Sequence, residues 1–344
     1  MDPWIRAGQP ALLLAPMEGV TDAPMRALMT ELPGFTHCVT EFLRISQIAL
    51  PHRCYPRHAT ELKTGSRTGA GVPVVFQLLG GHAERLALSA KAAAESGATG
   101  IDLNFGCPAP TVNNHDGGAA ILRCPERVEE IVGAVRAAVP PHIPVSAKLR
   151  LGWADPKAIF ENAQRAEKGG AAWITIHGRT KTQGYKPPAY WEPIAEVSKI
   201  VGIPVIANGE IWTLEDFKRC RDITRLEHFM IGRGALANPF LAQGIAHELG
   251  LPAPAVPANF PDQEEWRALL SRFIEISEPL SDNPSYTLRR VKQWMRYVDS
   301  RRAFADFQEL KRMEQLSDLR AALPRLRFPP FSATPAPALA GATP

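Results

Sequence analysis

The chain has 344 residues, of which 45% are hydrophobic and 22% charged, and its formal net charge is +4. This length and apolar content predict one large packed domain and a smaller one. The five cysteines include no CxxC pair, which argues against a disulfide framework and a metal site, so we expect reduced thiols in the cytoplasm. We also expect a monomer. A short N-terminal apolar run and the lack of any stretch of about 20 apolar residues predict neither a signal peptide nor a membrane partner.

Short apolar runs alternate with helix-like segments rich in Ala, Glu, Lys and Arg up to about residue 232. Eight strands alternating with helices predict an α/β fold, a (β/α)8 TIM barrel, because parallel strands covered on both faces are continuously apolar. A doubly wound sheet would usually have fewer strands and a GxGxxG turn after the first. The expected strands are Ala11–Ala15, His37–Glu41, Val72–Leu78, Gly100–Asn104, Pro144–Leu149, Ala172–His177, Ile203–Ala207 and His228–Ile231.

Polar or glycine-rich groups follow nearly every expected strand, at the face where barrel enzymes hold their active sites. Asn208-Gly209-Glu210 and Gly232-Arg233-Gly234 follow the last two strands, where this fold often binds a phosphate. Gln77, Lys148 and His177 belong to three other strand ends and could converge on one planar ring. A ring with a phosphate tail suggests flavin mononucleotide (FMN), whose negatively charged reduced form a lysine would stabilise. The alternative is that the lysine and histidine are ordinary polar residues that cap buried strands.

The motif Asn104-Phe105-Gly106-Cys107-Pro108 places a cysteine on the loop after the fourth expected strand. The flanking glycine and proline restrict the backbone around the thiol. A catalytic thiol and a buried, inert one are equally good interpretations of this motif alone. The polar groups at the other strand ends favour the first, and we interpret Cys107 as a proton donor.

The composition changes beyond residue 245, which ends the expected barrel domain of residues 1–245. Residues 246–261 include the stretch Leu251–Pro261, rich in proline and alanine, and predict a linker. Residues 262–327 predict a small all-α domain. Phe328–Pro344, with its proline and alanine repeats, predicts a disordered tail.

Within the helical domain, Leu288–Arg302 predicts an amphipathic helix. Its apolar face consists of Leu288, Val291, Met295 and Val298. The remaining arc has six basic residues against the single acid Asp299, a net charge of +5 (six minus one). Such one-sided charge, with Trp294 and Tyr297 interleaved, favours a nucleic-acid backbone with bases stacked nearby over a solvated face. The basic residues are Arg289, Arg290, Lys292, Arg296, Arg301 and Arg302.

Six separate blocks, in the expected order, resemble the signature blocks of bacterial tRNA-dihydrouridine synthases. The resemblance covers about residues 11–315 and implies an FMN-binding barrel followed by a helical domain that helps to hold tRNA. The blocks are Ala15-Pro16-Met17-Glu18-Gly19-Val20-Thr21-Asp22, Asn104-Phe105-Gly106-Cys107-Pro108, Lys148-Leu149-Arg150-Leu151-Gly152-Trp153, His177-Gly178-Arg179-Thr180, Ala207-Asn208-Gly209-Glu210 and Ile231-Gly232-Arg233-Gly234.

The resemblance implies that NADPH reduces FMN, that hydride passes from FMN to C6 of a uridine, and that Cys107 protonates C5. The target base must leave its stack. Asn104 would hydrogen-bond the flipped uracil, and Arg150 and Tyr185 would touch RNA or support the site. The positions that match FMN contacts are Pro16, Met17, Glu18, Gln77, Lys148, His177, Asn208, Gly209, Glu210, Gly232 and Arg233.

The likeness is greatest to the C-type bacterial enzymes, which reduce uridine 16 in the D loop of tRNA. Arg44, Arg290, Lys292 and Lys311 look like the RNA-orienting positions of that subtype, and Tyr297 is a further expected RNA contact. One departure is the segment Asn113-Asn114-His115-Asp116, which is bulkier than the glycine-rich stretch expected there and leaves that loop's conformation open. We expect its histidine to face solvent.

Two other functions are compatible with parts of this pattern. An FMN-dependent barrel could reduce a small pyrimidine or an enone, although the basic helix argues against it. A flavin- or tRNA-binding protein without turnover is also conceivable, although Cys107 in its motif argues against that.

Overall fold

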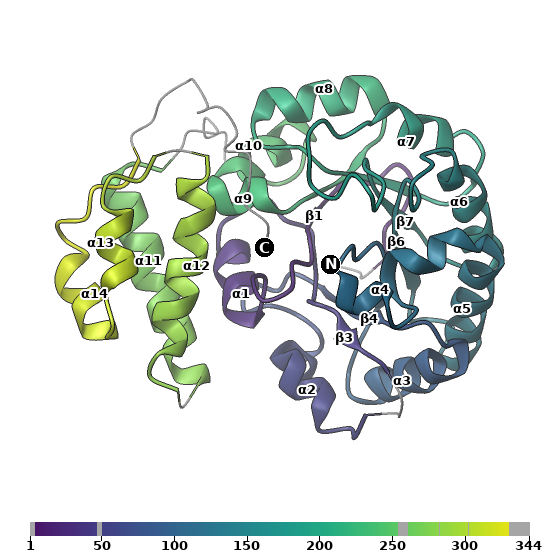
Figure 1. Cartoon of the computed structure of the whole chain (residues 1–344), viewed down its shortest axis with the longest axis horizontal. Helices are drawn as coiled ribbons and strands as arrows, with labels where there is room; N and C mark the ends of the chain where they lie inside the picture. The colour runs from purple at the N-terminus through teal and green to yellow at the C-terminus, as the bar shows by residue number, and fades with distance from the viewer. Residues whose placement is uncertain (1–3, 47–49, 254–260, 282, 302, 330–344) are drawn as a thin grey trace.

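The computed structural model describes residues 4–46, 50–253, 261–281, 283–301 and 303–329 (Figure 1). All eight predicted strands are present, and their ends differ from the predicted ones by at most two residues. A two-residue strand that no pattern predicted, β3, lies against β4. The strands are β1 (Ala11–Leu14), β2 (His37–Val39), β3 (Leu43–Arg44), β4 (Val74–Leu79), β5 (Ile101–Phe105), β6 (Val145–Arg150), β7 (Ile174–His177), β8 (Val205–Asn208) and β9 (His228–Ile231).

The strands close into a parallel barrel. β1 pairs with β2 on one side and with β9 on the other, and β2 pairs with β4. The (β/α)8 prediction is confirmed, because helices follow the strands and cover the outside of the barrel (Figure 1). These helices are α1 (Ala23–Glu31), α2 (Cys54–His58), α3 (Ala83–Glu95), α4 (Pro110–Asn113), α5 (Pro125–Ala138), α6 (Ala158–Lys168), α7 (Glu192–Val197), α8 (Leu214–Thr224), α9 (Arg233–Ala237) and α10 (Leu241–Glu248), with 3-10 turns η1 (Thr60–Thr64) and η2 (Gly118–Arg123).

The interior of the barrel changes from apolar to polar along its axis. Leu13, Val75, Ile206 and Met230 fill one apolar layer. The next inward-facing positions toward the carboxyl ends include buried polar side chains in place of the branched aliphatic residues that usually fill such layers. This polar layer forms the floor beneath the strand ends.

A helical domain packs beside the barrel against α1 and α9 (Figure 1). It consists of α11 (Gln263–Ser277), η3 (Glu278–Leu280), α12 (Tyr286–Asp299), α13 (Phe307–Arg312) and α14 (Leu316–Ala322). Asp262 caps α11 and accepts hydrogen bonds from the backbone N–H groups of Glu264 and Glu265. The predicted all-α domain is therefore present, and α12 coincides with most of the predicted amphipathic helix.

The predicted tail begins too early. Phe328 is only 2% exposed, stacks on Trp266 and Phe304, and exchanges backbone hydrogen bonds with the Gln263 amide. Ordered packing therefore continues to Pro329, which is also buried. The rest of that predicted tail, residues 330–344, lies outside the described residues, as do residues 254–260 of the predicted linker. The predicted linker begins too early as well, because α10 continues to Glu248. Among the described helices, none is long and apolar enough to cross a bilayer.

Candidate active site

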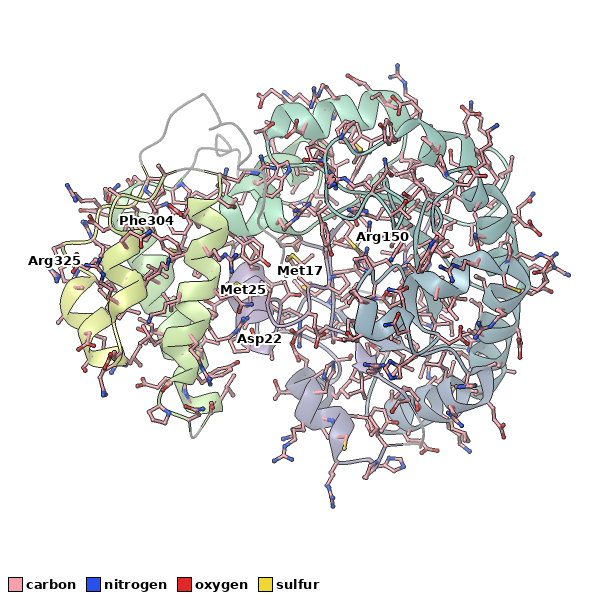
Figure 2. All side chains as sticks on the ribbon, viewed as in Figure 1. Met17, Asp22, Met25, Arg150, Phe304 and Arg325 are labelled. Atoms are coloured by element: carbon pink, nitrogen blue, oxygen red, sulfur yellow. The ribbon has the colours of Figure 1, made fainter. Side chains whose placement is uncertain are left out.

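The predicted site residues gather at the carboxyl ends of the barrel strands. In Figure 2, Arg150 lies over the barrel, whereas Met17 and Asp22 lie on the side nearer to the helical domain. The site is thus bounded by the barrel rim and, on one side, by α12.

The loop after β5 holds a half-buried Cys107 with a free thiol. The Asn104 side-chain oxygen accepts hydrogen bonds from the backbone N–H groups of Gly106 and Cys107, each at 2.9 Å. The carbonyl of Cys107 accepts from the Asn113 amide and from the backbone N–H of Ala119, each at 3.1 Å. Burial raises the pKa of the Cys107 thiol, so the group is protonated at neutral pH.

The glycine turn after this loop allows a close approach to the cysteine. Gly118 has a φ of +59°, and a Cβ there would lie 2.8 Å from the Cys107 carbonyl oxygen. The intervening bulky segment is also tied down, since Arg127 forms hydrogen bonds of 2.8 and 2.7 Å to the two carboxylate oxygens of Asp116. His115 is exposed, as expected. These contacts answer the question that the sequence left open about this loop.

Two arginines brace the cysteine loop from different sides. Arg150, which is 3% exposed, donates from Nε to the Gly106 carbonyl at 2.7 Å and from Nη1 to the Gly184 carbonyl at 2.8 Å. Arg44 donates to the carbonyl of Thr111 at 3.0 Å. Arg150 therefore supports the site by joining two loops.

Lys148 and His177 lie at adjacent strand ends with unusual protonation equilibria. Lys148 Nζ donates to the side-chain oxygen of Asn208 at 3.2 Å, and burial together with Arg150 lowers the pKa of Lys148 to about 8. Burial and the nearby Arg150 and Lys148 charges place the pKa of His177 well below 6.5, so the imidazole is neutral. Its Nδ1 is buried and has no hydrogen-bond partner among the described residues.

The loops after β8 and β9 form a small pocket lined by Asn208–Trp212 and Met230–Gly234. A Cβ at Gly234 would lie 2.2 Å from the Ile211 carbonyl oxygen, so the two loops approach each other as closely as glycine permits. A pocket walled by backbone in this place fits an anionic group such as a phosphate.

The side chains around this pocket are heavily paired. The Glu210 carboxylate forms an ion pair with Arg179 and accepts from the Trp212 indole at 3.0 Å. The Arg233 guanidinium lies over the rings of Tyr185 and Trp212, with distances of 4.8 and 5.0 Å to their centroids. Tyr185 is 39% exposed and forms part of the rim.

The loop after β1 reaches the same region. Met17 donates its backbone N–H to the Thr21 hydroxyl at 2.8 Å, and its sulfur would be 3.1 Å from a Cβ at Gly232. Glu18 is exposed beside the partly buried Pro16. The predicted cofactor positions after β1, β8 and β9 are therefore neighbours in space.

Arg290 does not lie on the exposed face of α12, where the charge pattern placed it. It is 8% exposed, its Nε donates to Asp22 Oδ2 at 2.7 Å, and its other nitrogens donate to the carbonyls of Gly19 and Val20. The Tyr286 hydroxyl donates to the same Asp22 oxygen at 2.7 Å. These bonds attach the helical domain to the loop after β1.

Two further expectations about α12 need correction. Trp294 is 1% exposed and its indole donates to the Leu236 carbonyl at 2.9 Å, so it is unavailable for stacking on a base. Lys292 donates to the backbone carbonyls of Lys311 and Met313 and so connects α12 to α13. These side chains are engaged because α12 packs against the barrel helix α9 as well as against α11 and α13. The buried part of its surface is therefore wider than the apolar face that the sequence shows.

A smaller basic surface remains on this domain. Four exposed side chains form no ion pair with any described residue, and the half-buried Tyr297 lies on the same helix as two of them. The predicted residue Arg302 lies outside the described residues. The four are Arg289, Arg296, Lys311 and Arg312.

Asp102 is a site residue that the sequence interpretation missed. It is 2% exposed inside the barrel, where it accepts hydrogen bonds from Gln77 and Ser146. The available signal was a carboxylate within the apolar strand β5, since such groups are almost never buried without partners.

A TIM barrel whose carboxyl end holds a protonated thiol, a half-buried lysine and a backbone-walled pocket has the arrangement of a barrel enzyme. A family model described as dihydrouridine synthase (Dus) matches residues 13–327, and the chain therefore belongs to the dihydrouridine synthase family of oxidoreductases. The expected family is confirmed.

Named relatives are similar over most of the chain. The tRNA-dihydrouridine(16) synthase of Ralstonia nicotianae is 44% identical over 83% of this chain and 86% of its own length. The protein of the same name from Aquipseudomonas alcaligenes is 42% identical over 91% of this chain and 99% of its own length. Among solved structures, a 2-naphthoyl-CoA reductase complex has a TM-score of 0.54 with 11% identity, covering 70% of this chain and 50% of that one, which is a likeness of fold alone.

Proposed function

We propose that this enzyme reduces a uridine in the D loop of tRNA, at position 16, to 5,6-dihydrouridine, with FMN as cofactor and NADPH as reductant. The observation that carries the proposal is the protonated, half-buried Cys107 thiol at the same barrel face as the half-buried Lys148 and the buried His177. The relatives named tRNA-dihydrouridine(16) synthase support the choice of position. We retain the expectation of a cytoplasmic monomer.

The residues present fit FMN. The pocket between the loops after β8 and β9 suits its phosphate, with Asn208, Gly209, Gly232 and Arg233 among the groups around it. The unpartnered Nδ1 of His177 suits a polar atom of the ring system. Bound FMN would supply hydride transfer from NADPH to C6 of the uracil.

Lys148 and Gln77 would contribute to that site in different ways. The Lys148 ammonium, charged below about pH 8, would favour negative charge on a group bound beside it. Gln77 has both ends of its amide engaged, so it would pack beneath the ring more than it would bond to it. The side chain of Glu210 is likewise occupied, so its backbone would be the contacting part.

Cys107 would deliver the proton to C5 of the base, because its raised pKa keeps the thiol in the form that can donate. Asn104 can only donate to the uracil, since its side-chain oxygen already accepts two backbone N–H groups. One hydrogen of the Asn104 Nδ2 group is already donated to Gln77. The other would therefore be donated to a carbonyl oxygen of the base. Arg150, Arg44 and the rim residue Tyr185 would hold the surrounding loops.

The tRNA backbone would lie on the exposed basic surface of the helical domain. Arg289, Arg296 and Lys311 are free to contact phosphates, and Tyr297 lies near Arg233 at the edge of the barrel site. Arg290 and Lys292 would assist tRNA binding from inside, because they fix the helix that presents these side chains.

Dihydrouridine mapping on tRNA from cells that lack this protein tests the reaction and the position together. We expect loss of dihydrouridine at position 16 alone, recovery with the wild-type gene, and none with Cys107→Ala. Purified Cys107→Ala protein should still bind FMN and be reduced by NADPH. Intact dihydrouridine at position 16 in the deletion strain would refute the proposal, and full activity of Cys107→Ala would remove the proton donor.

A further inference from the structure

Three neighbouring strands bring Gln77, Asp102 and Ser146 side by side inside the barrel. The strand register pairs Gln77 of β4 with Asp102 of β5, and Asp102 with Ser146 of β6. All three are buried, at 0 to 2% exposure. They form part of the polar layer of the barrel interior, below the loop after β5 that carries Cys107.

Hydrogen bonds run from the loop that carries Cys107 down to Asp102, which also accepts a hydrogen bond from its other side. The Ser146 hydroxyl donates to Asp102 Oδ1 at 2.6 Å, and Gln77 Nε2 donates to Asp102 Oδ2 at 2.7 Å. Asn104 Nδ2 donates to Gln77 Oε1 at 2.9 Å, and the N–H groups of Gly106 and Cys107 donate to Asn104 Oδ1.

The acceptor Asp102 at one end and the backbone N–H donors at the other end fix how the side-chain amides of Gln77 and Asn104 are oriented. Burial raises the pKa of Asp102, whereas hydrogen bonds from Ser146 and Gln77 and the charge of Lys148 oppose this shift. As a carboxylate Asp102 only accepts, so it requires the nitrogen of Gln77. The backbone at the other end only donates, so it requires the oxygen of Asn104. Each amide therefore has a single orientation that satisfies every partner. Reversing either one would bring two like atoms together, fully buried at Gln77 and half-buried at Asn104.

We propose that Asp102 is a positioning residue of the reaction, which acts through Gln77 and Asn104 to fix the loop that holds the Cys107 thiol. The inference rests on the proposed function only for the role of the thiol. Asp102 touches neither the substrate nor the reacting atoms in this arrangement. Its negative charge also lies near Lys148, whose protonated form it favours.

The proposal can be tested with variants that reverse the direction of the hydrogen bonds between Asn104, Gln77 and Asp102. Asn104→Asp puts an acceptor opposite Gln77, and if Gln77 turns over, its oxygen meets the acceptor Asp102. Adding Asp102→Asn supplies a donor at that end, so the double variant satisfies every group with Gln77 reversed. Asp102→Asn alone preserves the original direction, because its oxygen can face Gln77 while its nitrogen donates to the Ser146 hydroxyl.

The readout is the rate at which iodoacetamide alkylates Cys107, followed by mass spectrometry of its peptide in the purified protein. A mildly alkaline pH prevents a buried carboxyl from relieving the mismatch by taking up a proton. This readout is independent of tRNA turnover, which Asn104→Asp would also impair by losing its bond to the base. A failure of the proposed function would appear in the tRNA assay of the wild type, and a failure of this inference in the alkylation rates.

We expect Asn104→Asp and Asp102→Ala to raise the alkylation rate about tenfold, the size of effect that one lost buried hydrogen bond produces. Asp102→Asn and the double variant should stay within about threefold of the wild type, since all their buried groups remain paired. Wild-type alkylation in Asp102→Ala would overturn the proposal. A double variant as reactive as Asn104→Asp would do the same, and it decides the matter if Asp102→Ala fails to fold.

Discussion

Arg290 Nε donates to the Asp22 carboxylate at 2.7 Å across the boundary between the two domains. The two residues are 268 positions apart in the chain. Since Asp22 also caps α1 by accepting from the Met25 N–H, one carboxylate orients a barrel helix and receives a helix of the other domain.

Replacing Arg290 with alanine should lower the free energy of unfolding by about 3 kcal/mol, because it leaves a largely buried carboxylate with too few donors. Arg289→Ala is the matched control, since this neighbouring residue is exposed, and it should change stability by less than about 0.5 kcal/mol. Urea denaturation followed by circular dichroism measures both. Equal stability of the two variants would show that the ion pair contributes nothing.

Reversing the exposed charges of α12 should weaken tRNA binding without unfolding the protein. For Arg289→Glu with Arg296→Glu, we expect the slope of log K against log salt concentration to become shallower by about two, one for each lost phosphate contact. Lys168→Glu with Lys199→Glu alters the net charge equally at exposed sites at the ends of α6 and α7 and should leave the slope unchanged. A similar response of both pairs would mean that net charge, not this surface, controls binding.

The activity should fall as the pH rises through about 8, where Lys148 loses its proton. Cys107 does not account for this change, because its pKa is raised above the usual value of 9.0. Unfolding does not account for it either. The unfolded chain retains the lysine proton up to about 10.5, so this group makes the folded state more stable as the pH rises between the two values. Lys148→Met should be slower and should lack the transition in a pH profile of single turnovers; a transition that persists in Lys148→Met would assign it to another group.

Gly234→Ala should weaken FMN binding by at least about tenfold, because its Cβ would collide with the backbone of Ile211 and separate the pocket walls. Gly69→Ala is a suitable control, as nothing lies within 4 Å of the added methyl group and φ there is not in the left-handed region. Quenching of FMN fluorescence measures the affinity. If Gly234→Ala retained wild-type affinity, the phosphate would have to bind elsewhere.

The barrel was predictable because its strands are buried on both faces and therefore appear as unbroken apolar runs. The short strand Leu43–Arg44 was not predictable, since two residues are too few to show a pattern of apolar residues. The site residues at strand ends were found for the same reason, as a polar group at the end of an apolar run is conspicuous. Asp102 was missed because its partners come from other strands, and only the register brings them together.

In the helical domain, the spacing of apolar residues predicted the helix but not which of its side chains are buried. A single apolar stripe correctly located α12, but it describes a helix with one buried face. Packing against both the barrel and the other helices buried Arg290 and Trp294 as well, and neither contact is encoded in local spacing. The family resemblance located the function because it draws on six blocks in order, whereas the position of each side chain depends on tertiary contacts.

The Arg290 contacts also constrain the order in which the molecule can be completed during synthesis. The barrel can close as soon as β9 pairs with β1, but the carbonyls of Gly19 and Val20 have no arginine to bond until α12 has been made. The first loop of the chain is thus among the last to reach its final form. Nascent chains that end before α12 are therefore expected to hold this loop in a form that differs from the final one.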